Sequence, residues 1–306
     1  MRRALPAAGL LGAGIAIYGT ARALGRARAA ARARLAAHPV RRMALSHGDV
    51  AYIDCGPQPS EGASPGSVCE TILSVHGLYG GYDQALGNVG SLSEYCRVLA
   101  PSRFGYPGSA VRGDGSPADQ ATVFVFAERL DRLGIERVFV LGASAGGTPA
   151  IRFALDHPER VTGLILLSSA VPWPSRPATP PGHVGPPAIM NHDWVMWLPS
   201  PFFGPVLGMD PQTVHGVLPL SERRTTGADI DASITSQDMA VHFEDYPIEE
   251  LKPPVLLLHA RDDRVAPFAP PAGHVQSSMH RYPDLTSTEN SETTRLRVVC
   301  EVLVGE

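Results

Sequence analysis

Residues 138–148 read Val-Phe-Val-Leu-Gly-Ala-Ser-Ala-Gly-Gly-Thr and contain the pattern G-x-S-x-G at positions 142–146. Four residues of strand character, 138–141, lead directly into this pattern, and a helix-compatible segment follows over about 145–156. The order of strand, sharp turn and helix predicts that Ser144 lies at the tip of the turn.

The glycines on either side of Ser144 have a physical reason. A residue at the tip of so tight a turn has strained backbone angles, and strand and helix can pass each other only if the flanking residues are almost free of side chain. Gly142 and Gly146 meet that demand. The Ser144 hydroxyl would then be exposed, and the N–H of Ala145, at the helix N-terminus, would face an oxyanion formed there. A chain with 31 glycines also contains such patterns by chance, but the strand before and the helix after favour the functional interpretation.

The bulk composition is that of an ordinary globular protein. The chain has 306 residues, of which 44% are hydrophobic and 18% charged, enough for one large core or a core with an inserted lid. The net charge of −4, with the basic residues crowded at one end, gives no case for a nucleic-acid partner. The four cysteines, Cys55, Cys69, Cys96 and Cys300, have no metal-ligand spacing, so we expect no metal, no cofactor and no disulfide framework.

The N-terminal region, residues 1–41, differs in composition from the rest. Residues 4–21 carry no charged side chain and are followed by the arginine-rich segment 22–42, with no acid before Asp49. Such a length is at the short end of the roughly 17–25 residues that span a bilayer, so the sequence predicts a single-pass membrane anchor. Two alternatives are a cleaved signal peptide followed by secretion, and an Arg/Ala-rich helix that associates with anionic lipid. A solvated linker helix over 22–37 is nearly as good an interpretation.

The remaining chain alternates strand-like and helix-like segments. A hairpin is expected over 42–55 and a buried strand over 71–75, followed by His76-Gly77-Leu78-Tyr79-Gly80-Gly81. A glycine-rich turn at the end of a strand frees a backbone N–H for a ligand, and Leu78 is the candidate for a second oxyanion donor. His76 precedes the turn, so we interpret it as a brace for the loop and not as a base.

Further strands are expected over 97–101, 138–141 and 163–168, with helices over 82–96 and from Ser116 to Gly134 between them. This alternation predicts an α/β fold with a mostly parallel central sheet, helices on both faces and a ligand site beyond the carboxyl ends of the strands. The core is expected over 42–170 and 251–306.

The regular pattern is interrupted between residues 171 and 250. This stretch holds a proline-rich run and all three tryptophans, with several Met and Phe side chains. We expect a helical lid over the strand ends and, from its composition, a small apolar substrate. For any single one of these side chains, packing of the lid onto the body is the better explanation.

The pattern resumes at 255–267, where a strand ends at His259-Ala-Arg-Asp262-Asp263 before Pro267. A carboxylate that follows the nucleophile in chain order and ends a strand has the position of a triad acid. Asp263 is the preferred candidate, and a helix N-cap is its alternative role.

Together the segments 76–81, 102–106, 142–147 and 259–267 resemble the α/β-hydrolase fold family, in particular its lid-bearing serine hydrolases of the esterase and lipase kind. The resemblance covers roughly residues 45 to 270. It implies Ser144 as nucleophile, the N–H groups of Leu78 and Ala145 as oxyanion hole, and Asp263 as the acid that orients a histidine. It also implies cleavage of an ester, thioester or lactone through an acyl-enzyme.

The histidine departs from the family pattern. In the family it follows the next strand, but the strand-like run 295–304 is followed by two residues and no histidine. Only His274 and His280 come after Asp263, and His280 is the candidate base because 279–283 is compatible with a shortened strand. The sequence therefore predicts a serine hydrolase, with a catalytically impaired binding protein as the alternative and acyl transfer to an acceptor other than water left open.

Overall fold

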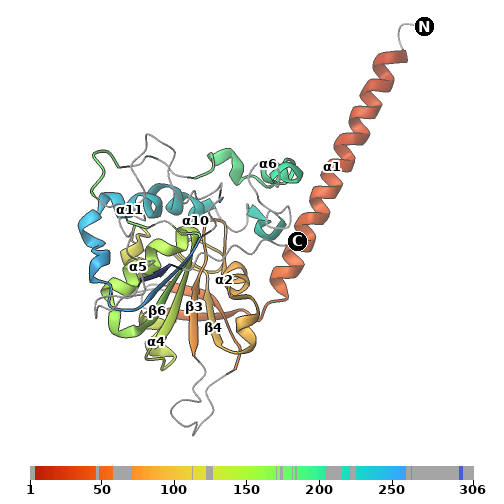
Figure 1. Cartoon of the computed structure of the whole chain (residues 1–306). Helices are drawn as coiled ribbons and strands as arrows, with labels where there is room; N and C mark the ends of the chain where they lie inside the picture. Colours follow the sequence, from red (N-terminus) through yellow and green to blue (C-terminus); the bar gives the residue numbers. More distant parts are fainter. Residues whose placement is uncertain are drawn as a thin grey trace.

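The computed structural model describes residues 4–45, 48–57, 70–111, 113–121, 127–169, 171–172, 175–180, 182, 185–203, 215–220, 225–259, 263 and 296–298. In these residues the centre of the fold is an eight-stranded sheet with the strand order β1-β2-β4-β3-β5-β6-β7-β8 (Figure 1). The strands are β1 (Arg41–Leu45), β2 (Gly48–Cys55), β3 (Thr71–Val75), β4 (Arg97–Pro101), β5 (Val138–Ala143), β6 (Val161–Leu167), β7 (Val255–Leu258) and β8 (Leu296–Val298).

The sheet is mostly parallel. β1 and β2 form an antiparallel hairpin, and β2 is antiparallel to β4, whereas every pairing from β4 through β8 is parallel. Because parallel strands are joined by crossover connections, helices come to lie on both faces of such a sheet. The expected fold class is confirmed.

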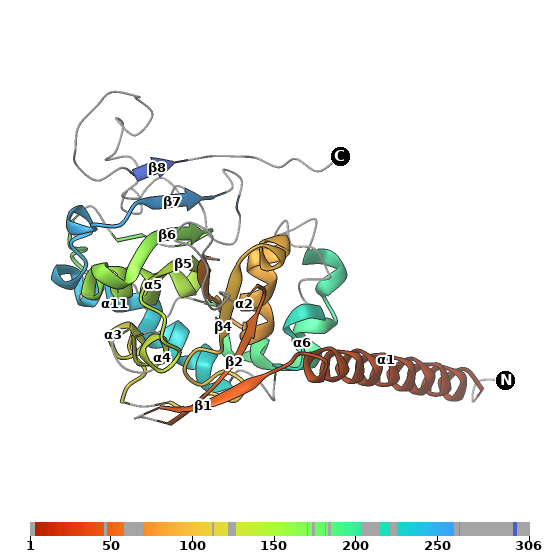
Figure 2. The ribbon, with the colours of Figure 1, turned by 90° about the horizontal axis from the view of Figure 1, so that it is seen from below.

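Helices lie on both sides of the sheet (Figure 2), and each face of the sheet belongs to a hydrophobic cluster of its own. On one face α2 (Tyr82–Val89) packs with β2, β3 and β4, and on the other α4 (Ala127–Arg132) and α5 (Gly147–Asp156) pack with β3, β5 and β6. Strand side chains point alternately to the two faces, so Leu73 joins the α5 layer while its neighbour Ile72 joins the α2 layer. The sequence of each central strand is therefore apolar at nearly every position.

Two expected helices differ in extent from the prediction. The helix expected over 82–96 is divided into α2 and the 3₁₀ turn η1 (Gly90–Glu94), because Gly90 ends α2 with a positive φ of 56°. The helix expected from Ser116 begins as α3 (Pro117–Asp119), where the Ser116 hydroxyl accepts a hydrogen bond from the Asp119 N–H at 3.2 Å. Residues 122–126 lie outside the described part, and α4 follows them.

The stretch between β6 and β7, here called the inserted segment, contains short helices in its described parts. They are η5 (Ala188–Asn191), α6 (Asp193–Trp197), η6 (Ser200–Phe202), α10 (Thr225–Ile230), the π-helix η7 (Asp231–Thr235), α11 (Ser236–Val241), η8 (Phe243–Asp245) and η9 (Ile248–Glu250). The Gly227 N–H donates to the Gly105 carbonyl at 3.2 Å, on the loop that follows β4. The inserted segment thus packs on loops at the carboxyl ends of the strands. Its function as a lid and the domain limits expected for it stay predictions.

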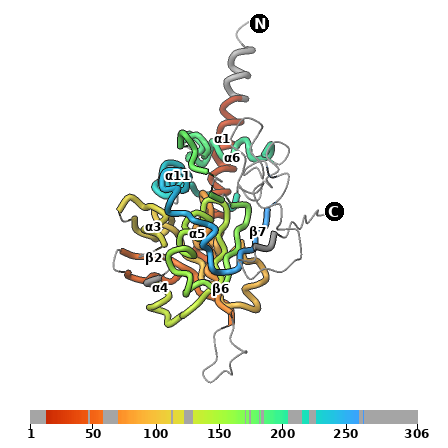
Figure 3. The backbone as a smooth tube through the Cα atoms, turned by 60° about the vertical axis from the view of Figure 1, so that its left-hand side comes forward, coloured from red at the N-terminus to blue at the C-terminus, as the bar shows by residue number. Residues whose placement is uncertain are grey.

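The first helix, α1 (Ala4–Ala36), extends far beyond the body (Figures 1 and 3). In its projecting part Ile15, Ile17 and Tyr18 are exposed, whereas Ala31, nearer the body, is only 1% exposed. In the part of the chain that the structure describes, no helix meets the length and hydropathy needed to cross a membrane. The single-pass anchor expected over residues 4–21 is therefore not supported.

Candidate active site

Ser144 lies at the end of β5, in a sharp turn that becomes the 3₁₀ turn η3 (Ser144–Gly146) and then α5. Its φ is 50°, in the left-handed region that costs a non-glycine residue roughly 1–2 kcal/mol, and the residue is exposed. Strand and helix approach so closely that a Cβ on Gly142 would lie 2.7 Å from the Ala150 Cβ and 2.8 Å from the Gly147 Cα. The surrounding fold thus holds Ser144 in a strained, accessible position.

The loop after β3 passes directly against Ser144. A Cβ on Gly77 would lie 2.9 Å from the Ser144 Cβ and 3.5 Å from its Oγ. The loop turns back at once, since the Gly80 N–H donates to the Gly77 carbonyl at 3.2 Å. The Gly77 N–H itself donates to Gln84 Oε1 at 3.0 Å, so it is not available as an oxyanion donor.

The two N–H groups expected to form an oxyanion hole belong to Leu78, which follows Gly77, and to Ala145, which follows Ser144. Leu78 and Ala145 are both half-buried, and among the described residues neither N–H has a hydrogen-bond acceptor. Donors without an internal partner at the edge of a site are the arrangement that stabilises a developing oxyanion. Their assignment as the oxyanion hole stays a prediction.

His76 is completely buried and braces the loop. The Arg103 N–H donates to His76 Nε2 at 2.9 Å, so the ring proton is assigned to Nδ1, which lies 2.8 Å from the Gly77 carbonyl. The ring also packs edge-on against Tyr106 at 4.6 Å. Because both ring nitrogens are engaged, His76 is not placed to take a proton from Ser144, in agreement with the structural role expected for it.

A buried ion pair joins this loop to the inserted segment. The Arg103 guanidinium pairs with Asp231 on η7 and donates to the His76 carbonyl at 3.2 Å and to Gln120 Oε1 at 3.1 Å. The Tyr106 hydroxyl donates to Asp231 at 2.6 Å. Burial raises the pKa of Asp231, although the Arg103 charge and the Tyr106 hydrogen bond favour its ionised form. No sequence signal marks this pair, because the two residues are 128 positions apart.

The candidate acid lies at the same edge of the sheet. Asp263 Oδ2 is 3.8 Å from His259 Nε2, and both side chains are largely buried. Ala143, Leu167 and Leu258 are in register across β5, β6 and β7, so Ser144 and His259 follow them two strands apart, at about 10 Å between backbones. The imidazole beside Asp263 is thus that of His259, for which the sequence predicted no function. The candidate base, His280, lies outside the described residues.

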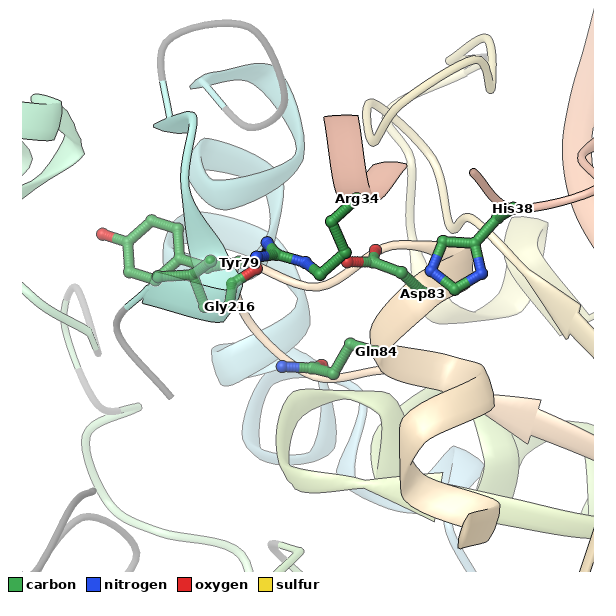
Figure 4. A pocket seen from close by; sticks show the side chains of 7 residues that line it. Arg34, His38, Tyr79, Asp83, Gln84 and Gly216 are labelled. Carbon is green, nitrogen blue, oxygen red and sulfur yellow. Dashed lines mark hydrogen bonds between the residues drawn. The ribbon is translucent and has the colours of Figure 1, made fainter. Parts of the chain in front are cut away.

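A cavity of about 260 Å³ lies behind the loop that carries Leu78 (Figure 4). Its walls come from the base of α1, from that loop, from α2 and from the inserted segment, and they are Arg34, His38, Tyr79, Asp83, Gln84, Gly216 and Val217. The Arg34 guanidinium donates to the carbonyls of His215 at 3.2 Å and Gly216 at 3.0 Å. Within the described ranges, no three His, Cys, Asp or Glu side chains gather as metal ligands.

The fold and the serine turn together are those of an α/β hydrolase. Residues 70–269 match the family described as the alpha/beta hydrolase fold, and the chain belongs to that family. Among solved structures, a hydrolase from Pseudomonas aeruginosa has a TM-score of 0.55 at 19% identity, with 87% of this chain and 91% of that chain covered. An alpha/beta hydrolase fold protein from Nakamurella multipartita has a TM-score of 0.53 at 21% identity, with 74% and 83% covered.

Curated relatives match parts of the chain. The dihydrolipoyllysine-residue acetyltransferase component of the acetoin cleaving system from Cupriavidus necator is 37% identical over 106 residues, which are 35% of this chain and 28% of that protein. The 2-hydroxy-6-oxononadienedioate/2-hydroxy-6-oxononatrienedioate hydrolase from Paraburkholderia phymatum is 31% identical over 150 residues, 45% of this chain and 50% of that protein. This chain thus spans half or less of the length of these two relatives, one of which is a hydrolase by name.

Proposed function

We propose that the chain is a serine hydrolase that cleaves a carboxylic ester or a related acyl compound through an acyl-enzyme at Ser144. The observation that carries this proposal is the exposed Ser144 at a φ of 50°, with the loop of Gly77 packed against it. An accessible hydroxyl beside two N–H groups without acceptors among the described residues is suited to acyl transfer.

The cluster of side chains around the loop supports the substrate class that we propose. Leu78 and Tyr79 pack with apolar side chains of the inserted segment, including Met190, Met196 and Trp197. A small apolar acyl group fits such surroundings, since binding sites for small molecules are lined mainly by hydrophobic and aromatic side chains.

In the proposed reaction the Ser144 Oγ attacks the acyl carbon while its proton passes to a base. The N–H groups of Leu78 and Ala145 donate to the oxyanion, and the C–O bond breaks as the proton is returned to the alcohol that leaves. Water then gives a proton to the base and attacks the acyl-enzyme, and the base returns that proton to the Ser144 Oγ as the acid leaves. Asp263 orients the base, for which His280 is the candidate and His259 the alternative that contacts Asp263.

The test is labelling with a fluorophosphonate probe together with turnover of p-nitrophenyl esters. We expect the wild-type chain to be labelled and to hydrolyse the esters, and Ser144→Ala to lose both, with turnover falling on the order of 10⁴- to 10⁶-fold. Ser91→Ala, at an exposed position of η1, is the matched control. His280→Ala and His259→Ala, measured side by side, identify the base by the loss of turnover. A folded wild-type chain that takes no label would overturn the proposal.

The second candidate is a hydrolase-like protein that binds an acyl compound without turnover. It is favoured by His76, the imidazole on the loop against Ser144, whose two nitrogens are both engaged. Retention of a labelled acyl ligand without ester turnover would select this candidate. One relative is an acetyltransferase component by name, which is consistent with transfer of the acyl group to an acceptor other than water. Faster release of the acyl group on addition of an alcohol would reveal such a transfer.

We also propose that α1 holds the chain at an anionic lipid surface. The arginines Arg22, Arg26 and Arg32 are exposed on α1, and no acidic residue occurs before Asp49. Arginines near a membrane surface contribute about 1 kcal/mol each to binding of anionic lipid.

A further inference from the structure

Tyr79 is the residue that follows the candidate oxyanion donor Leu78, and its backbone is in an unfavourable conformation. It occupies the third position of the turn closed by Gly77 and Gly80, with a φ of 57°. Glycine is the usual residue at a turn position with positive φ, and a side chain there costs roughly 1–2 kcal/mol. A tyrosine in this conformation persists only because contacts elsewhere hold it.

Those contacts come from the inserted segment. The Tyr79 hydroxyl donates to Asn191 Oδ1 at 2.5 Å, over a separation of 112 residues. Tyr79 as a whole residue is 7% exposed, and it packs with Ala31 of α1 and with Met196 and Leu218 of the inserted segment. Ring packing and one hydrogen bond therefore fix the Tyr79 side chain to elements outside its own loop.

The acceptor lies close in the chain to a residue that is itself fixed by other parts of the protein. Asn191 ends η5, two residues before Asp193 at the start of α6. Asp193 is 1% exposed and accepts hydrogen bonds from Arg28 Nε of α1 and from the Leu220 N–H, each at 2.5 Å. Asn191, the partner of Tyr79, is thus only two residues along the chain from Asp193, the partner of Arg28 on α1.

We infer that Tyr79 is a positioning residue that ties the oxyanion loop to the inserted segment and so fixes the direction of the Leu78 N–H. The inference rests on the proposed function, since it assigns a task to Tyr79 in the same reaction. An oxyanion donor acts only when it is aimed at the place where charge develops. When the hydroxyl bond to Asn191 is removed, the turn at Tyr79 relaxes toward a less strained conformation and the Leu78 N–H turns away.

The test is Tyr79→Phe, which keeps the ring packing and removes only the hydroxyl. We expect kcat to fall by about 10- to 100-fold, as for other small misplacements of a catalytic group, with a KM within about twofold. Amide hydrogen exchange in residues 77–81 should be faster than in the wild-type chain. Tyr95→Phe, at a side chain that is 71% exposed, is the matched control and should change neither quantity.

Two substitutions of Asn191, which accepts the hydrogen bond from Tyr79, form the second pair of variants. Asn191→Leu should reproduce the fall in kcat, and Asn191→Asp, which keeps an acceptor for the Tyr79 hydroxyl, should retain more activity than Asn191→Leu. Unchanged kcat or unchanged exchange in Tyr79→Phe would overturn the inference. If the wild-type chain hydrolyses no ester, the proposed function fails, and exchange in residues 77–81 alone decides whether Tyr79 holds the loop.

Discussion

Arg129 on α4 is a completely buried cation without a hydrogen-bond partner among the described residues. Its guanidinium lies 4.6 Å from the centroid of the Tyr52 ring, a favourable but weak contact. Burial lowers the pKa of Arg129 to about 9, although Tyr52 and Asp54 act in the opposite direction. The folded state therefore binds this proton less tightly than the unfolded chain. The cost to stability is fully present below pH 9 and decreases as the pH rises toward 12.5.

Replacing the charge should therefore stabilise the protein. We expect Arg129→Met to raise the free energy of unfolding by roughly 1–4 kcal/mol at pH 7.5, as for other buried charges replaced by apolar side chains of similar volume. Urea denaturation measures the change. Arg132→Met, on the same helix but exposed, is the control and should stay within about 0.5 kcal/mol of the wild-type value. A less stable Arg129→Met variant would show that the electrostatic attraction to Tyr52 and Asp54 outweighs the desolvation.

At the scale of the residue, the sequence predicted what local geometry dictates. The turn at Ser144 was predictable because the glycines on both sides are required by the close approach of strand and helix. The hydrogen bond from Tyr79 to Asn191 was not, because it joins residues 112 positions apart. Residues so far apart in the chain become partners only when whole elements pack together. Local periodicity and motif spacing do not predict that packing.

At the scale of the element, the same distinction explains the helices and strands. The strands expected over 71–75 and 97–101 agree with β3 and β4, because short apolar runs between turn residues leave few alternatives. The helix expected over 82–96 ends early because the positive φ of Gly90 closes it. The docking of α1 was not predicted, since it depends on Asp193, which is 165 residues from Arg28.

The ion pair between Arg28 and Asp193 is one of the contacts that hold α1 to the inserted segment, beside the hydrogen bonds of Arg34 and the packing of Ala31. Asp193 is buried, whereas the Arg28 side chain is 36% exposed. We expect Asp193→Asn to keep the acceptor for Leu220 but to weaken the contact with Arg28, so that trypsin cleaves after Arg32 about tenfold faster. The loss of a hydrogen bond to a charged group, about 1.5–3 kcal/mol, accounts for a factor of that size.

The control for this variant is Asp245→Asn, which removes an ion pair of the exposed kind. The Asp245 side chain is 55% exposed and lies 3.5 Å from Arg152, and such pairs contribute about 0–1 kcal/mol. Equal cleavage rates for the two variants would show that α1 is held by the packing of Ala31 and the hydrogen bonds of Arg34 and not by the ion pair of Arg28.

At the scale of the whole molecule, the charge is divided unevenly. The chain carries a net charge of −4, yet its first 48 residues contain no acid. The projecting part of α1 has exposed apolar side chains at Ile15 and Ile17. One end of the molecule is thus basic and apolar, while the body carries the excess of negative charge.

This division predicts binding to anionic vesicles. We expect the full chain to sediment with vesicles that contain phosphatidylserine, to be released by high salt, and not to bind neutral phosphatidylcholine vesicles. Replacing three exposed arginines of α1 by glutamine should weaken binding by roughly 100-fold, about 1 kcal/mol for each; they are Arg22, Arg26 and Arg32.

The control replaces three exposed basic residues of the body, Arg132, Arg176 and Lys252, by glutamine. This variant has the same change in net charge and should bind anionic vesicles as the wild-type chain does. Equal weakening in both variants would mean that net charge, and not the basic helix, governs the association.

The separation between Arg28 and Asp193 has a consequence for synthesis. Arg28 is translated 165 residues before its buried partner, an interval of roughly 8–33 s at the usual rates of the ribosome. During that interval the nascent helix lacks the surface of the inserted segment, on which Arg28 and Arg34 later find their partners. The Arg28 side chain is therefore able to bind other anions before Asp193 has been synthesised.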